Sequence, residues 1–167
     1  MMEEIFPIVT ENGDIVGSAT RSECHSGGKL LHPVVHLHVF NNKGELLLQK
    51  RSMNKDIQPG KWDTSVGGHI DFGEKPEDAL IREAHEELGI ESFKAEPLRK
   101  YIYESEIERE LVYSFKTVWE KEIHFDPNEI DEVRFFSFHE IESLKKSKSV
   151  TPNFIFEYEW LQKNIIL

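Results

Sequence analysis

Residues 68–90 carry the sequence GHIDFGEKPEDALIREAHEELGI, in which a glycine-rich turn leads into a charged helix. Pro76 suits the first position of a helix, where its missing N–H leaves no hydrogen bond unmade. Gly89 suits the end of a helix because glycine adopts the left-handed conformation without steric cost. The sequence therefore predicts a helix over residues 76–88.

This predicted helix has an apolar face beside an acidic face. At about 100° per residue, the apolar side chains share one sector, which we expect to face the core. This sector comprises Leu80, Ile81, Ala84 and Leu88. The adjacent sector carries three carboxylates, at Glu83, Glu86 and Glu87.

Carboxylates at this spacing repel one another. Arg82 can reach Glu86 one turn away, but a single arginine cannot neutralise three acids. Magnesium can, because it prefers oxygen ligands and bridges carboxylates to substrate phosphates. A solvated acidic helix face is the simpler alternative, and the helix alone does not exclude it.

The residues around the helix favour the magnesium site. Seven positions follow the order G-x5-E-x7-R-E-x-x-E-E-x-G, and they are Gly68, Glu74, Arg82, Glu83, Glu86, Glu87 and Gly89. This pattern resembles the signature box of the Nudix hydrolase family, to which MutT-like enzymes belong. Ala84 departs from it mildly, since the family prefers a larger aliphatic residue there. Residues 46–51, 59–63 and 127–137 also resemble segments of that family.

The resemblance implies an α/β fold of the Nudix type, an α/β/α sandwich with a mixed β-sheet. We expect one Nudix domain over residues 1–167, with an N-terminal hairpin extension over residues 1–30 and the box at residues 68–90. A homodimer paired through the hairpin remains open.

The resemblance also implies roles for the residues of the box. Glu83, Glu86 and Glu87, called the box glutamates below, would bind Mg²⁺, or Mn²⁺ as a substitute, with the backbone carbonyl of Gly68. Glu83 or a neighbour would act as the base on the attacking water. Arg82 and Glu74 would hold loop and helix in register through ionic hydrogen bonds. The expected reaction is hydrolysis of a diphosphate linkage in a nucleoside diphosphate derivative or a similar small phosphorylated metabolite.

Two basic residues follow a predicted strand before the box. Lys50 and Arg51 are candidates for binding substrate phosphates, the arginine in bidentate fashion. Ordinary surface charge is the alternative for both.

A second resemblance is to the isopentenyl-diphosphate isomerases, which share the Nudix fold. Residues 62–69 resemble that group, and it implies histidine metal ligands at His25, His32 and His69 with an acidic pair at Glu108 and Glu110. The isomerases need a cysteine where this chain has Gly67. We therefore expect an isomerase-like hydrolase without isomerase activity. An isomerase-like enzyme and a catalytically silent nucleotide-binding module are the alternatives.

The rest of the chain alternates predicted strands and helices. We expect strands at residues 5–9, 15–20, 33–40, 45–50, 62–66, 98–103, 111–119 and 133–136, and helices from Ser137 to about residue 146 and from Thr151-Pro152 onward. His36 and His38 share one face of the strand at 33–40, where we expect them to line a polar surface.

Composition narrows the possible partners. The chain of 167 residues has a net charge of −11, which disfavours extended nucleic acid. No segment has the length and apolarity of a membrane span. The N-terminus does not resemble a secretory signal, and the single Cys24 cannot form an internal disulfide. We expect a cytoplasmic enzyme acting on a small molecule.

Overall fold

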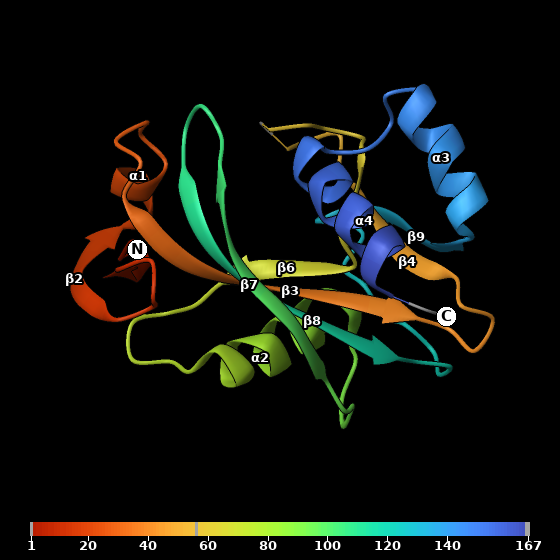
Figure 1. Cartoon of the computed structure of the whole chain (residues 1–167), viewed down its shortest axis with the longest axis horizontal. Helices are drawn as coiled ribbons and strands as arrows, with labels where there is room; N and C mark the ends of the chain where they lie inside the picture. The colour runs from red at the N-terminus through yellow and green to blue at the C-terminus, as the bar shows by residue number, and fades with distance from the viewer. Residues whose placement is uncertain (1, 56, 166–167) are drawn as a thin grey trace.

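The computed structural model describes residues 2–55 and 57–165, and it places helices on both sides of a mixed β-sheet (Figure 1). The strands are β1 (Ile5–Val9), β2 (Ile15–Thr20), β3 (Leu31–Phe40), β4 (Leu46–Arg51), β5 (Trp62–Asp63), β6 (Val66–His69), β7 (Glu96–Glu104), β8 (Arg109–Val118) and β9 (Ile130–Phe136). The helices are α1 (Arg21–Cys24), α2 (Pro76–Leu88), α3 (Phe138–Lys146) and α4 (Pro152–Asn164). The predicted α/β class is confirmed.

Strand β3 lies at the centre of the sheet, and all ten of its residues are buried. It pairs in parallel with β8 and antiparallel with β6 and β4, while β7 pairs with β8, and β5 and β9 pair with β4. Figure 1 shows α2 on one side of this sheet and α4 on the other. A strand covered on both faces reads as a continuous buried run, which explains why β3 does not alternate between core and solvent.

The two faces of the sheet form separate cores. Under α2, Val35, Leu37 and Val39 of β3 pack with Leu80 and Leu88 of the helix. On the opposite face, apolar side chains of β4 and α4 pack with Trp62. They are Leu46, Leu48, Phe154, Tyr158 and Leu161. The site described below is therefore supported by packing from both layers.

The expected position of His36 and His38 on a polar surface is wrong. Both are buried, with 7% and 0% of their areas exposed. Each bonds to Glu157 of α4, because this helix covers the face that the alternating pattern assigned to solvent.

The predicted burial of one apolar residue of the box helix α2 is also wrong. Ile81 is 57% exposed, whereas Leu80, Ala84 and Leu88 are buried as expected. The buried arc of α2 is turned away from Ile81 and towards Ala79, which is fully buried. Glu83 and Glu87 lie inside this arc, between the apolar positions.

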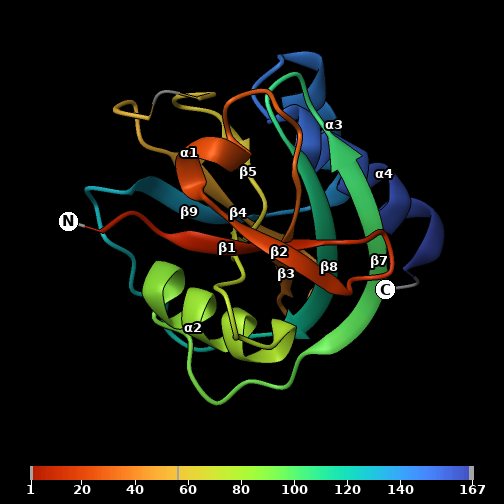
Figure 2. The same ribbon diagram turned by 90° about the vertical axis from the view of Figure 1, so that its left-hand side faces the viewer.

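The N-terminal segments form the expected hairpin of β1 and β2. In Figures 1 and 2 this hairpin lies at one end of the sheet, where β1 contacts β3. The short helix α1 was not predicted, although its capping box between Thr20 and Glu23 has the expected Thr-x-x-Glu sequence. No helix in the described ranges has the length and hydropathy that crossing a bilayer requires.

Candidate active site

Helix α2 begins and ends where the sequence predicts. Pro76 occupies its first turn, and Gly89 ends it in the left-handed conformation, with φ of 66°. The preceding loop brings Gly68 of β6 back over the helix. A Cβ atom built on Gly68 would lie 2.1 Å from Cδ of Glu83. Only glycine allows the backbone and this carboxylate to lie so close.

The box glutamates line one cavity of about 920 Å³, within the range of small-molecule sites. The same cavity is lined by Gly68, Arg51, His36, Tyr103 and Glu110. Among the described residues, ten carboxylates and four lysine or arginine side chains line it. An anionic substrate therefore needs additional positive charge to bind there.

Arg82 links the loop to the helix. Its guanidinium donates to both carboxylate oxygens of Glu74, at 2.9 Å each, and to the backbone carbonyl of His69 at 3.0 Å. It also donates to Glu83 at 2.8 Å and to Glu86 at 3.4 Å. The pair of Arg82 and Glu74 that the family resemblance implies is thus present.

Glu87 is held separately from the other two box glutamates. Its carboxylate accepts from the side-chain amide of Gln49 at 2.9 Å and from the backbone N–H of Gly67 at 3.2 Å. Burial raises the pKa of Glu87 to about 8 and also raises the pKa of Glu83. Burial disfavours the charged form of a carboxylate, and a nearby cation reverses this preference.

These features fit a divalent cation. The half-buried carboxylates of Glu83 and Glu87 lie beside the backbone of Gly68 and Gly67, respectively, and hard oxygen donors suit Mg²⁺. The box glutamates do not bring three ligand atoms within 4.8 Å of one another. Arg82 bonds to Glu83 and Glu86, while Glu87 bonds to Gln49. The role of the box glutamates as ligands stays a prediction.

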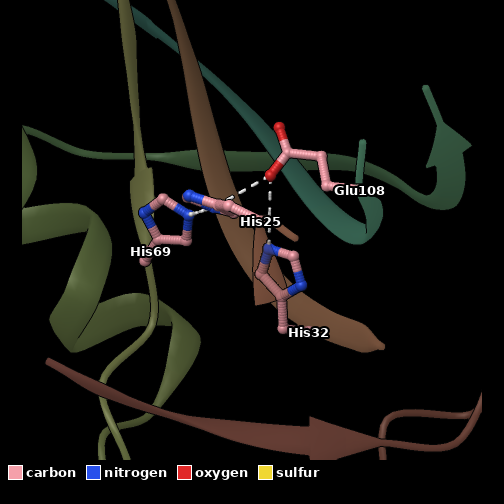
Figure 3. Close-up of side chains that lie close together, drawn as sticks. All are labelled: His25, His32, His69 and Glu108. Atoms are coloured by element: carbon pink, nitrogen blue, oxygen red, sulfur yellow. Dashed lines mark hydrogen bonds and ion pairs between the residues drawn. The ribbon is translucent and has the colours of Figure 1, made fainter. Parts of the chain in front are cut away.

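Of the described histidines, cysteines and acids, one group has at least three ligand atoms within 4.8 Å of one another. It consists of His25, His32, His69 and Glu108, which come from four separate segments (Figure 3). One carboxylate oxygen of Glu108 lies 2.9 Å from Nε2 of His25 and 3.7 Å from Nε2 of His32, while Nε2 of His25 and Nε2 of His69 are 3.3 Å apart. This is the histidine set implied by the isomerase resemblance.

The group has the character of a ligand set. His32 directs Nδ1 to the carbonyl of Leu30, so its other nitrogen faces the group. That Nε2 atom and one oxygen of Glu108 are buried without a hydrogen-bond partner among the described atoms. Burial, with the charge of Arg21, lowers the pKa of His69 to about 2 and keeps this imidazole neutral. Glu110 lies opposite His32 in the β3–β8 pairing and lines the cavity, but it is outside the close group.

The two basic candidates have different positions. Arg51 lines the cavity, where it pairs with Asp63 at 3.3 Å and donates to the carbonyl of Ile57. Lys50 is not among the residues that line the cavity. Phosphate binding by either residue stays a prediction.

Comparison with known proteins places this geometry in a family. The NUDIX domain family matches residues 30–158. The chain belongs to the Nudix family. It is similar to the uncharacterized Nudix hydrolase lmo0368 of Listeria monocytogenes, with 34% identity over 98% of this chain and 96% of that protein. Together, the family match and this Nudix hydrolase relative identify the chain as a pyrophosphohydrolase.

The isomerase resemblance is confirmed as a relationship within the Nudix family. An isopentenyl-diphosphate Delta-isomerase of Escherichia coli is 37% identical over 59% of this chain and 54% of that enzyme. The crystal structure of DR0079 from Deinococcus radiodurans has the same fold, with a TM-score of 0.81 and 24% identity over 93% of this chain and 98% of that one. Nudix hydrolases typically use a divalent metal ion.

Replacement of Gly68 by alanine tests the close approach of loop and helix. The new Cβ would occupy the place of the Glu83 carboxylate, whose flexible end can move away. We expect the affinity for Mn²⁺ to fall by about tenfold or more, with little change in melting temperature. Gly17→Ala is the control, since a Cβ there meets no atom within 4 Å. Equal Mn²⁺ affinities in the two variants, measured by titration, would contradict this role of Gly68.

Proposed function

We propose that this Nudix enzyme is a magnesium-dependent hydrolase of a diphosphate linkage in a nucleoside diphosphate derivative or a similar small phosphorylated metabolite. The observation that carries this proposal is the position of Glu83 and Glu87, which lie half-buried on the wall of an acidic cavity beside Gly68 and Gly67. Such a cavity binds phosphates only together with cations.

The roles of the side chains follow from their positions. Glu83, Glu86, Glu87 and the carbonyl of Gly68 would hold the metal. When bound, Mg²⁺, or Mn²⁺ in its place, neutralises phosphate charge and makes water more acidic. Arg82 keeps Glu83 near the loop, and Arg51 offers a donor from the lining of the same cavity.

The reaction is a hydrolysis at phosphorus. A water oxygen attacks one phosphorus atom while the bond from that phosphorus to the bridging oxygen breaks. The proton of the water passes to a carboxylate, which we assign to Glu83 or a neighbour, and the second phosphate group leaves. The products are two phosphorylated fragments, or one fragment and inorganic phosphate.

Isomerisation is disfavoured by the residue at position 67. A carbon acid needs a proton donor or acceptor at the reacting carbon. Gly67 has no side chain to supply one. Cys24 is buried on α1 in an apolar cluster with Phe6 and Ala19, and it does not line the cavity. The intact acidic pattern of the box suits hydrolysis instead.

Substitution of single glutamates tests the hydrolase proposal. We expect Glu83→Gln and Glu87→Gln each to reduce turnover by about 10²-fold or more, since each removes a ligand or base while retaining shape. The assay follows released phosphate or monophosphate from nucleoside triphosphates, dinucleotides, ADP-ribose and isopentenyl diphosphate with Mg²⁺.

The matched control is Glu77→Gln, an exposed position on the same helix outside the cavity. Its turnover should stay near that of the wild type. Near-normal rates in both Glu83→Gln and Glu87→Gln would overturn the mechanism. Formation of an allylic product from isopentenyl diphosphate would instead support the isomerase alternative, and tight binding without turnover would support a silent nucleotide-binding module.

We also propose that His25, His32, His69 and Glu108 bind a second divalent metal ion. Imidazole and carboxylate ligands suit a transition metal. We expect the purified chain to bind Co²⁺ with a visible absorption band that His69→Asn abolishes and that Glu83→Gln preserves. His124→Asn is the control, because the side chain of this histidine is 70% exposed and does not belong to the group. An unchanged band in His69→Asn would exclude this site.

A further inference from the structure

A second buried polar cluster lies under the C-terminal helix. Glu157 of α4 is only 2% exposed, although it lies in an apolar layer. Nδ1 of His36 is 2.5 Å from one of its carboxylate oxygens, and the Tyr101 hydroxyl donates to the same oxygen. His38 bonds to the other oxygen. One carboxylate of α4 therefore binds two histidines of the central strand.

The two histidines differ in what their rings reach. His36 lines the cavity of the box glutamates, whereas His38 is fully buried and does not line it. The His36 ring edge opposite the bonded nitrogen packs over Gly67. A Cβ atom built on Gly67 would lie 3.3 Å from Cδ2 of His36 and 3.5 Å from its Nε2. The missing side chain at Gly67 thus leaves this edge open towards the cavity.

The bonded carboxylate also sets the charge of His36. Burial alone lowers the pKa of His36, but the negative charge of Glu157 and its hydrogen bond outweigh burial and raise this pKa to about 9. With Nδ1–H donated to Glu157, a charged ring carries a second N–H at Nε2. Only four lysine or arginine side chains among the described residues line this cavity, so a charged N–H donor from His36 would add to the binding of an anionic ligand.

We propose that His36 is a substrate-binding residue that donates a charged hydrogen bond from Nε2 to a phosphate oxygen of the bound molecule. Glu157 is a positioning residue, since it touches only the opposite nitrogen of the ring. The C-terminal helix thereby contributes to the site although it lies on the far face of the sheet from α2. The proposal rests on the proposed function only in taking the ligand to be a diphosphate.

The test measures affinity for methylenediphosphonate in the presence of Mg²⁺, because its P–C–P unit resists hydrolysis. We expect His36→Gln to weaken this affinity by about tenfold or more, as loss of a charge-assisted hydrogen bond does. His38→Gln is the matched control, since it loses a bond to the same carboxylate without altering the cavity wall. Its affinity should stay within about twofold of the wild type.

A double-variant comparison tests the positioning role. Glu157→Gln should weaken binding in the wild-type background and have little further effect in the His36→Gln background. Melting temperatures of all variants report folding separately. If a substitution prevents folding, NMR of the imidazole nitrogens in the wild-type protein takes the place of the variant comparison. Methylenediphosphonate should then shift the signal of His36 Nε2 and leave both His38 signals in place.

The outcomes separate this inference from the proposed function. Unchanged affinity in His36→Gln, equal losses in His36→Gln and His38→Gln, or no shift at His36 Nε2 would overturn the inference while leaving hydrolysis intact. Weakened binding in His36→Gln, in a protein that hydrolyses none of the compounds assayed, would support the inference and contradict the proposed function.

Discussion

Partial burial of two carboxylates, Glu83 and Glu87, beside the apolar layer beneath α2 is the constraint on which the site depends. Glu83 and Glu87 share the inward arc of the helix with leucine and alanine, which raises the pKa of both acids. Uncompensated burial of such groups costs stability. Arg82 offsets part of this cost at Glu83, while the backbone of Gly67 and the amide of Gln49 offset it at Glu87. A cation bound at the proposed site would offset the rest of this cost.

The central strand β3 is buried along its whole length, yet it carries polar side chains at or near the cavity of the box glutamates. His32 belongs to the close histidine group, and His36 lines the wall beside Gly67. His36 is compensated from outside the strand by Glu157, whereas Nε2 of His32 lies 3.7 Å from Glu108 without a hydrogen bond. Parallel pairing with β8 places Glu110 beside His32. A carboxylate of α4 therefore satisfies His36, which would otherwise destabilise the core.

Local sequence patterns predicted where the helices and strands lie better than they predicted which side chains are buried. The bounds of α2 followed from Pro76 and Gly89, which are local signals, and the two strands of the first hairpin lie where the sequence predicts. Exposure of Ile81 and burial of His36 could not be predicted this way, because each depends on which distant element covers a face. Glu157 gave no sequence signal as a partner of His36, since 121 positions separate them. The gathering of His25, His32 and His69 followed from family resemblance rather than from spacing.

A structure determined with Mn²⁺ and methylenediphosphonate, using the anomalous scattering of manganese, tests the central claim most directly. We predict a manganese peak within about 2.3 Å of carboxylate oxygens from Glu83 and Glu87 and of the Gly68 carbonyl, with a phosphonate oxygen on the same ion. A diphosphonate bound in the cavity with no manganese at these glutamates would contradict the account.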